Sequence, residues 1–409
     1  MGTALAADLE SLGRVLLQFY RAVNLLYRRS VDGKSPEWIA RLLDQGKPAG
    51  LIALQRHPAC KSDTPRVIRP DILLTEDGYA ISELDSVPGG IGLTQWLNQT
   101  YTAAAEIDPN AMPGVIGGAD GMKHGFASLF GDATLVHLVV SEESAGYRPE
   151  MDWLAGELGR ERFAVRDSAF TGFQPGDAAY RFFELFDLPN IASAAALFAQ
   201  AAERTVRVTP PPKPIFEEKL LFALLWNRNL RSFWRQELGE AFFNRLLKVV
   251  PQTWVLDPEP LSPHAAYPGL DLTEWSQLKA LSQKERELIL KVSGFNENAW
   301  GARGVHLGSD LSTAEWSAAV DAALTAFPQS PYILQRFHRP RVVESTYVDS
   351  VSDLPVAMPG RVRLCPYYFV SGDGDAARPS LGGVLATVVP SDKKIVHGMT
   401  DAILAPCSV

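Results

Sequence analysis

Cysteine is scarce in this 409-residue chain. The three cysteines, Cys60, Cys365 and Cys407, lie far apart and in no CxxC spacing. This small, odd number excludes a disulfide framework and a zinc knuckle, and it favours a reducing compartment. Long apolar runs are missing too, because no segment reaches the roughly 18 residues that a membrane span requires. A basic excess is also absent, since 39 Lys and Arg against 47 Asp and Glu give a net charge of −8. A general binder of nucleic acid or anionic membranes is therefore not expected.

The first thirty residues lack the basic start and the apolar block of a signal peptide. Their apolar residues recur at helical spacing, which predicts an amphipathic helix. These residues are Leu9, Leu12, Val15, Leu16, Phe19, Val23 and Leu26. We therefore expect a soluble, cytoplasmic protein with no membrane partner, for which a homodimer is the default assembly.

The overall composition is that of a folded globule, with 46% hydrophobic and 21% charged residues. At this length it predicts two or three domains. Strand-like and helical runs alternate between residues 134 and 190, which is typical of a parallel α/β sheet. A proline-rich segment at 208–214 indicates a semi-rigid spacer. Strand-like runs at 331–337, 361–370 and 382–389 then indicate an α+β domain with antiparallel strands.

The most informative segment is a predicted hairpin around the turn sequence Thr-Glu-Asp-Gly. If its loop is residues 76–78, Arg69 faces Asp85 and Asp71 faces Glu83, and all four charges share one face. A two-residue loop would shift this register. Three carboxylates beside one arginine repel one another unless a cation neutralises them, and carboxylate oxygens suit Mg²⁺. The competing interpretation is a solvated face with chance charges.

A second segment places Lys291 at the end of a strand-like run, just before Gly294. Glycine lets backbone N–H groups approach a phosphate, and the ammonium group neutralises its charge. No GxxxxGK[ST] or GxGxxG motif occurs in the chain. Taken alone, this segment is better explained as a surface loop, and Lys219 as an ordinary lysine of an amphipathic helix.

Four stretches, taken in order, resemble the circularly permuted ATP-grasp ligases, and most closely the synthetase part of glutathionylspermidine synthase. The first is Arg-x-Asp at 69–71, followed by Glu-x-Asp at 83–85. The second is Glu-Lys-Leu-Leu-Phe-Ala-Leu-Leu-Trp at 218–226. The third is Lys291 with its glycine loop, and the fourth is Tyr-Ile-Leu-Gln-Arg-Phe at 332–337. The acidic residues precede the lysines, which is the order of the permuted form.

The resemblance implies a mixed α/β (α+β) protein with a circularly permuted ATP-grasp fold and a Rossmann-like subdomain. Residues 1–130 would form N-terminal helices and the metal-binding hairpin, 131–209 the α/β subdomain, and 210–409 the ATP-binding domain. The implied activity is that of an ATP-dependent carboxylate–amine ligase. Such an enzyme forms an amide or peptide bond through an acylphosphate and releases ADP and phosphate.

The resemblance also implies ATP and Mg²⁺ as cofactors, and a small carboxylate and an amine as substrates. Arg69 would be the catalytic residue that holds the substrate carboxylate or the transferring phosphoryl group, because its planar fork suits oxyanions. The implied metal ligands are Asp71, Glu83 and Asp85. The implied ATP-binding residues are Lys219, Lys291, Gly294, Gln335 and Phe337.

Two features keep other functions open. The family carries Asn where this chain has Asp85, and the arginine that reaches the phosphates could be Arg361, Arg363 or Arg378. The main alternative is therefore a catalytically altered nucleotide-binding protein with a regulatory or scaffold role. An oxidoreductase built on the sheet near 134–190 is a third possibility, disfavoured by the missing GxGxxG. The sequence identifies neither substrate.

Overall fold

The computed structural model describes four stretches of the chain, which are residues 1–108, 114–299, 303–396 and 401–409. Its contacts divide the chain into two compact units, each assembled from separate stretches of sequence. Unit 1 comprises Met1–Asn24, Gly50–Glu217 and Pro340–Val409. Unit 2 comprises Leu25–Ala49 and Glu218–Arg339. None of the helices in the described stretches has the length and apolar character that crossing a bilayer requires.

The expected amphipathic helix at the N-terminus is present as α1 (Thr3–Val31). Each of its seven predicted core residues is at most 1% exposed. The i, i+3, i+4 spacing explains this burial, because it gathers the apolar side chains on one face of the helix. Two shorter helices follow, α2 (Glu37–Asp44) and α3 (Ala49–Arg56), so the expected helical start of the chain is confirmed.

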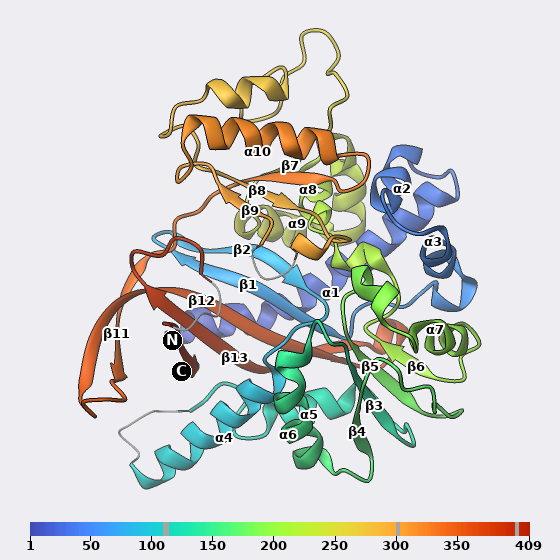
Figure 1. The fold of residues 1–409 in the computed structure, drawn as a ribbon, viewed down its shortest axis with the longest axis vertical. Coiled ribbons are helices and arrows are strands. Elements are labelled where there is room, and N and C mark those ends of the chain that lie inside the picture. The colour runs from blue at the N-terminus through green and yellow to red at the C-terminus, as the bar shows by residue number, and fades with distance from the viewer. Residues whose placement is uncertain (109–113, 300–302, 397–400) are drawn as a thin grey trace. The chain divides into compact units, whose positions relative to one another are not determined.

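Unit 1 contains a large antiparallel sheet in the order β14-β13-β12-β1-β2, with β11 paired to β12 (Figure 1). Its strands are β1 (Val67–Thr75), β2 (Gly78–Asp85), β11 (Val342–Val348), β12 (Pro355–Ser371), β13 (Arg378–Pro390) and β14 (Ile403–Pro406). Helices α4 (Ile91–Ile107) and α5 (Gly121–Ser128) pack against β13. The predicted hairpin is therefore joined to antiparallel strands from the C-terminal end of the chain.

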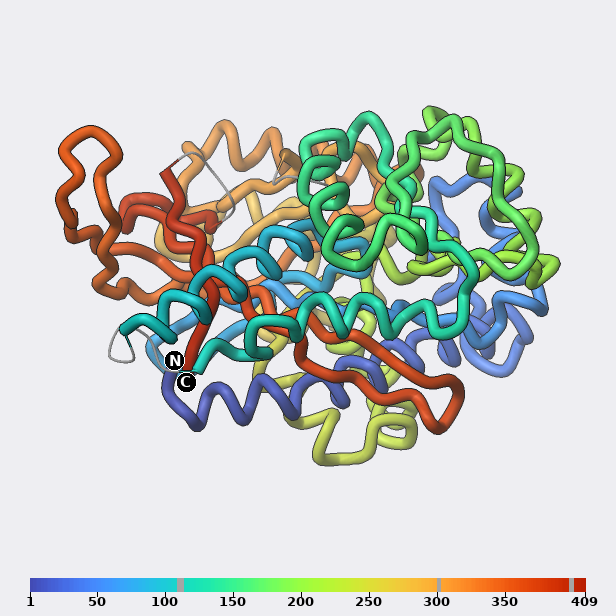
Figure 2. Tube along the Cα trace, turned by 90° about the horizontal axis from the view of Figure 1, so that it is seen from below, coloured from blue at the N-terminus to red at the C-terminus, as the bar shows by residue number. Residues whose placement is uncertain are grey.

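The two chain ends lie side by side in unit 1, as Figure 2 shows. The amino group of Met1 donates a hydrogen bond to the Ser408 carbonyl at 2.7 Å. Pairing of β12 with β1 brings residues about 300 positions apart into direct opposition, for example Val67 and Phe369. The position of the hairpin is thus set by contacts that no local sequence pattern contains.

A second sheet of unit 1 is fully parallel, in the order β4-β3-β5-β6, which confirms the predicted α/β alternation. Its strands are β3 (Val136–Val140), β4 (Phe163–Arg166), β5 (Ala178–Phe182) and β6 (Arg207–Thr209). Helices α6 (Arg148–Leu158) and α7 (Ala194–Ala202) connect them. Edge-to-face aromatic contacts fill the core, such as Phe126 with Tyr180 at 5.0 Å between ring centroids.

The proline-rich segment is not the spacer that the sequence predicted. Its residues from Thr209 to Pro214 are buried within unit 1. Because prolines lack an N–H, this run cannot form a regular hydrogen-bonded helix or strand, and its carbonyls accept from donors elsewhere. The buried Arg181 guanidinium donates to the carbonyls of Pro210 and Pro211, at 3.0 Å each. This guanidinium therefore holds the segment against the parallel sheet.

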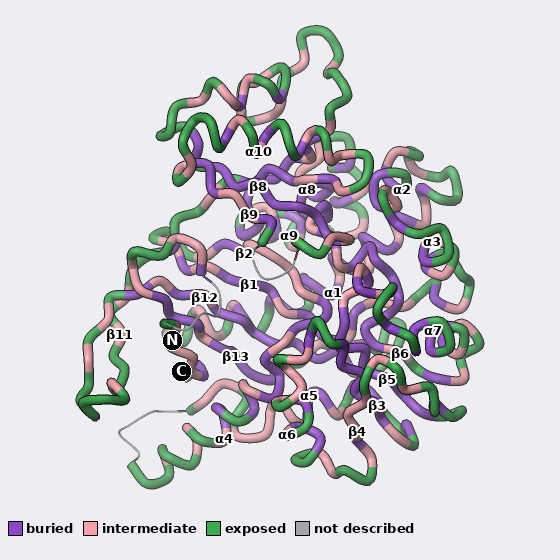
Figure 3. Tube along the Cα trace, viewed as in Figure 1, coloured by how far each residue is buried: buried purple, intermediate pink, exposed green. Residues whose placement is uncertain are grey.

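Unit 2 contains a four-stranded antiparallel sheet in the order β7-β10-β8-β9. Its strands are β7 (Thr253–Val255), β8 (Leu288–Val292), β9 (Val305–Leu307) and β10 (Tyr332–Arg336). After α2, its helices include α8 (Leu220–Trp226), α9 (Arg231–Val249) and α10 (Thr313–Ala326). Helix α10 begins with a capping box formed by Ser312 and Glu315. Figure 3 shows β8 buried, whereas much of α10 is exposed.

Candidate functional site

The β1–β2 hairpin places the predicted charged residues opposite one another. Arg69 pairs with Asp85, and Asp71 pairs with Glu83, so this prediction is confirmed. On the other face of the hairpin, Ile68, Ile72, Leu74 and Ala80 are buried, and Leu84 is half-buried. The hairpin therefore separates a charged face from a core face, as the period of two requires.

The turn of this hairpin differs from the predicted one. Thr75 pairs with Gly78, so the loop has two residues and not three. The positive φ of 137° at Gly78 accordingly lies at the start of β2, outside the loop. A two-residue loop alone would shift the register and separate the charged pairs. A β-bulge at Ser82 adds one residue to β2 and restores the register, so the predicted pairing holds although the predicted loop is wrong.

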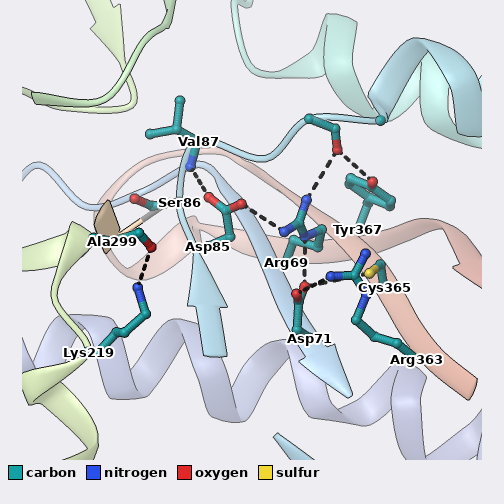
Figure 4. Close-up of polar contacts among 12 residues, drawn as sticks. Arg69, Asp71, Asp85, Ser86, Val87, Lys219, Ala299, Arg363, Cys365 and Tyr367 are labelled. Carbon is teal, nitrogen blue, oxygen red and sulfur yellow. Dashed lines mark hydrogen bonds and ion pairs between the residues drawn. The ribbon is translucent and has the colours of Figure 1, made fainter. Parts of the chain in front are cut away.

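Arg69 lies between two carboxylates (Figure 4). Its Nε donates to Asp71 Oδ1 at 3.0 Å, and its Nη2 lies 2.8 Å from Asp85 Oδ2. Its Nη1 donates to the Gly89 carbonyl at 3.3 Å. The same carbonyl accepts a hydrogen bond from the Tyr367 hydroxyl at 2.7 Å. All three nitrogens of the guanidinium group are thus used, and the planar fork is held in one orientation.

A second arginine, Arg363 on β12, joins the same cluster. Its Nη1 donates to Asp71 Oδ2 at 2.8 Å, so both oxygens of Asp71 face a guanidinium group. The Nε of Arg363 is buried and has no hydrogen-bond partner among the described residues. The Cys365 thiol lies 3.5 Å from Asp71 Oδ1, and burial raises its pKa to about 12, so it stays neutral.

The two aspartates respond differently to their surroundings. Burial opposes ionisation of Asp71, but Arg363 and Arg69 hold the pKa of this carboxyl below its ordinary value. Burial raises the pKa of Asp85 against the attraction of Arg69, and the negative charge of Asp71 adds to the rise. Asp71 is therefore the firmly ionised partner of the arginines, while Asp85 ionises less readily.

Arg363 is the one of the three arginines left open by the sequence that reaches this cluster. Arg361 donates to the Ser391 carbonyl at 2.9 Å, and Arg378 donates to the Ala377 carbonyl at 2.9 Å. Alternation along β12 places Arg363, Cys365 and Tyr367 on one face, which is a usable sequence signal. Sequence reasoning named Arg363 as one of three candidates but could not choose it, because the pairing of β12 with β1 is a long-range contact.

The metal-binding role of the three carboxylates stays a prediction. Within the described stretches, no group of three His, Cys, Asp or Glu side chains is arranged to hold a metal ion. Asp71 is already engaged by two guanidinium groups, while the Asp85 side chain is 23% exposed. Mg²⁺ commonly takes one or two protein carboxylates and completes its shell with phosphates and water. Asp85 and Glu83 fit that donor set better than Asp71.

Unit 2 holds the predicted nucleotide-binding residues. Lys291 on β8 is buried, and its Nζ donates to Gln335 Oε1 on β10 at 3.0 Å. Gln335 Nε2 in turn donates to Thr253 Oγ1 on β7 at 3.1 Å. Lys219 donates from its Nζ to the Ala299 carbonyl at 2.9 Å, as Figure 4 also shows. Lys291 thus lies on the sheet of unit 2, and Lys219 contacts the loop that follows β8.

A buried ion pair ties the two lysine segments together. Glu218 accepts the Ser293 hydroxyl and lies 2.5 Å from the Lys47 ammonium, and both charged side chains are at most 2% exposed. The Leu220 N–H donates to Ser293 Oγ at 3.1 Å. The structure therefore brings Lys219, Lys291 and Gly294 into one part of unit 2. Sequence reasoning missed Lys47, which no motif or spacing marked.

Backbone donors at the end of the 332–337 stretch are engaged by other parts of the chain. The Phe337 N–H donates to the Glu287 carbonyl at 3.0 Å, and the Arg336 N–H to the Gln252 carbonyl at 2.9 Å. These backbone donors are thus used within the protein. Residues 300–302, in the glycine-containing loop that follows Lys291, lie outside the described residues. The ATP-binding roles of Gln335 and Phe337 stay predictions.

Known proteins were compared with this chain by sequence and by structure. No family model matches the chain, and no curated protein matches it. Among solved structures, a protein assigned as a gamma-glutamylcysteine synthetase from Methylobacillus flagellatus is 10% identical, with a TM-score of 0.40 over 96% of this chain and 88% of that one. A glutathione synthetase-like effector from Globodera pallida, in its apo form, is 12% identical, with a TM-score of 0.53 over 99% of this chain and 87% of that one. The chain therefore has a fold similar to that of a glutathione synthetase-like protein.

Proposed function

We propose that this protein is an ATP-dependent carboxylate–amine ligase of the circularly permuted ATP-grasp type. The observation that carries the proposal is the buried Nε of Arg363, which has no partner among the described residues and lies beside Arg69 and Asp71. Leaving such a donor unpaired costs about 1–3 kcal/mol, and an oxyanion would relieve that cost. A substrate carboxylate or a transferring phosphoryl group fits this position.

The residues of unit 1 would act on the carboxylate substrate and the metal. Arg69 and Arg363 would bind the oxyanion, and Asp71 would keep both guanidinium groups in place. Glu83 and Asp85 are the carboxylates that would hold Mg²⁺, which neutralises phosphate charge when bound. Compared with the role that the resemblance implies, this assigns Asp71 to the arginines in place of the metal.

The residues of unit 2 would act on the nucleotide. Lys219 and Lys291 would neutralise ATP phosphates, and Ser293 with Glu218 would hold the two lysine segments in register. In the proposed reaction, a carboxylate oxygen attacks the γ-phosphoryl group and ADP leaves. An amine then attacks the acyl carbon, and phosphate leaves as the amide forms. Catalysis would come mainly from positioning and charge neutralisation.

The state of two aspartates favours the alternative of a nucleotide-binding protein with altered catalysis. Asp71 is fully engaged by arginines, and Asp85 stands where the family carries Asn. A protein of this kind would bind ATP without coupling its cleavage to amide formation. The two functions differ in one readout, which is ADP release that requires both an acid and an amine.

An ADP-release screen against panels of carboxylates and amines, with ATP and Mg²⁺ present, tests the proposal. We expect ADP only when both substrate classes are present. Glu83→Gln and Lys291→Ala should remove nearly all of it, while Lys248→Ala, an exposed lysine of α9, should leave it unchanged. Full activity in Glu83→Gln would contradict the assigned role, and ATP binding without ADP release from any pair would favour the alternative.

A further inference from the structure

Strand β11 forms an edge of the large sheet in unit 1. Among the described strands it pairs with β12 alone, from Val342 opposite Arg361 to Val348 opposite Pro355. An edge strand presents backbone N–H and C=O groups that can pair with another strand, and proteins often protect it with proline, lysine or a bulge. β11 reads Val-Val-Glu-Ser-Thr-Tyr-Val, and its pairing with β12 is continuous. Its outer edge is therefore able to accept a further strand.

Exposed apolar side chains gather on the same hairpin. Of the nine large apolar side chains that are exposed in the described stretches, five lie between residues 342 and 354. Three of these are on β11 itself, where Val342 is 46%, Tyr347 39% and Val348 62% exposed. Figure 1 shows β11 at the outer side of the sheet, and Figure 3 shows the loop that follows it as exposed. Such a concentration of apolar surface on a sheet edge is typical of a protein contact.

The sequence of β11 is complementary to itself in one antiparallel register. Two copies of a strand that pair about a two-fold axis place each residue opposite one equally far from the axis. The axis must pass through a residue, because opposite residues have to direct their backbone groups the same way. An axis at Ser345 gives the pairs Arg341–Asp349, Val342–Val348, Val343–Tyr347 and Glu344–Thr346.

The neighbouring registers fit less well. An axis at Glu344 places this carboxylate opposite its own copy, and like charges directly opposite each other are destabilising. An axis at Thr346 places Asp349 opposite Val343 and Glu344 opposite Val348, so each charge meets an apolar side chain. The axis at Ser345 instead pairs valine with valine, valine with tyrosine, and arginine with aspartate. Apolar and opposite-charge pairs of this kind stabilise antiparallel strands.

Arg341 and Asp349 flank β11 directly and would form one ion pair on each side of the axis. Arg341 is exposed. The Asp349 carboxylate accepts the Val351 N–H at 3.2 Å, and the Ser352 N–H and hydroxyl at 2.8 Å each, all through Oδ1. These bonds hold the carboxylate at the end of the strand. Within the described residues none of them uses Oδ2, which suits a guanidinium group from a second copy.

We propose that a second copy of this chain binds here, through antiparallel pairing of the two β11 strands about a two-fold axis at Ser345. Backbone hydrogen bonds would join the large sheets of the two copies, and the two ion pairs would fix the register. Because the charges of β11 match those of its own copy, they favour this occupant over a strand of another protein. The proposal gives an interface to the expected homodimer and does not depend on the ligase function.

Sedimentation velocity of the full-length protein over a concentration series tests the pairing. We expect the wild type to dimerise. Arg341→Asp and Asp349→Arg should each weaken dimerisation by about tenfold or more, because each replaces two ion pairs by two like-charge pairs. An equimolar mixture of these two variants should dimerise like the wild type, since a mixed dimer restores both ion pairs. Glu203→Arg, at an exposed glutamate of the same unit, should leave dimerisation unchanged.

Ser345→Cys tests the position of the axis. The three native cysteines are buried, so mild oxidation should link only introduced thiols. Ser345→Cys places two thiols opposite each other, about 5 Å apart at Cβ, and should give a disulfide-linked dimer. Val348→Cys places its thiols about 20 Å apart along the strands and should not.

Four results would each overturn the proposal. These are a wild type that stays monomeric up to about 100 μM, charge variants that dimerise like the wild type, a mixture that stays monomeric, and equal cross-linking of Ser345→Cys and Val348→Cys. A dimer that forms through another surface would give the second and fourth of these results.

Discussion

The Arg363 guanidinium lies 2.8 Å from Asp71 Oδ2, although 292 residues separate the two in the chain. The pair joins strand β12 to strand β1, and the Asp71 side chain is only 9% exposed. Arg69 approaches the other oxygen of the same carboxylate. This one buried charge therefore holds two arginines, on two strands, in the orientation that an incoming oxyanion would meet.

Asp71→Asn should destabilise the fold strongly. The substitution leaves Arg363 without its counter-charge and Arg69 with Asp85 alone, and breaking a buried pair of this kind costs about 3–5 kcal/mol. Urea unfolding should show this loss, and the Asp71→Asn/Arg363→Met double variant should recover part of it because the unpaired charge is removed. A loss below about 0.5 kcal/mol in the single variant would contradict the role assigned to Asp71.

The bulge at Ser82 predicts losses of stability of different size for two one-residue changes. Deleting Ser82 removes the extra residue and leaves Arg69 opposite Asp85, so it should cost about 1 kcal/mol for the lost Ser82–Asp71 hydrogen bond. Inserting one alanine after Ser82 moves Asp85 out of register and should cost on the order of 3 kcal/mol. Chemical unfolding measures both, and equal losses would show that the bulge does not set the register.

Lys291→Met should weaken ATP binding while leaving unit 2 folded. The methionine keeps much of the side-chain volume but loses the charge, and a contact between charged groups is worth about 1.5–3 kcal/mol, or roughly 10- to 150-fold in affinity. Calorimetric titration with ATP and Mg²⁺ measures the change. Lys248→Met is the matched control, since Lys248 is an exposed lysine of the same unit. Equal affinities for the two variants would remove Lys291 from the nucleotide site.

Glu150 should make stability depend on pH. Its carboxylate accepts the Gly90 N–H at 2.8 Å and the Leu93 N–H at 3.2 Å, yet burial raises its pKa to about 7. Because this pKa is above the unfolded value, the stabilisation is complete below about pH 4.5 and is lost as the pH rises through 7. The loss should be on the order of 3 kcal/mol.

Urea unfolding between pH 5 and 8 measures this dependence. Glu150→Gln stays neutral at every pH, so its stability curve should lack this part of the decline. Glu203→Gln, an exposed glutamate, should keep the wild-type slope. An identical slope in Glu150→Gln and the wild type would show that Glu150 is not the titrating group.

Local patterns predicted those parts of the structure that depend on local physics. The N-terminal helix α1 forms as predicted because its apolar residues recur at helical spacing. The hairpin pairs Arg69 with Asp85 because its two strands are adjacent in sequence. The bulge at Ser82 was not predictable in this way, since it depends on how β1 and β2 fit the rest of the sheet.

Long-range contacts account for what the sequence could not show. Arg363 reaches Asp71 only through the pairing of β12 with β1, and Lys47 reaches Glu218 from a segment with no motif. The proline-rich segment looked like a spacer because composition alone cannot show that Arg181 uses its carbonyls. In each case a buried charged side chain is paired with a group that lies far from it in the sequence.

The measurement that most directly tests the proposed ligase chemistry is the ATP-dependent formation of hydroxamates. Hydroxylamine attacks an acylphosphate in place of the amine, so a pool of carboxylates can be screened without knowing the amine. We predict hydroxamate formation that requires ATP and Mg²⁺ and is absent in Glu83→Gln and Lys291→Ala. Hydroxamate yields that are equal in the wild type and in both variants, or no hydroxamate from a carboxylate that supports ADP release, would contradict the acylphosphate mechanism.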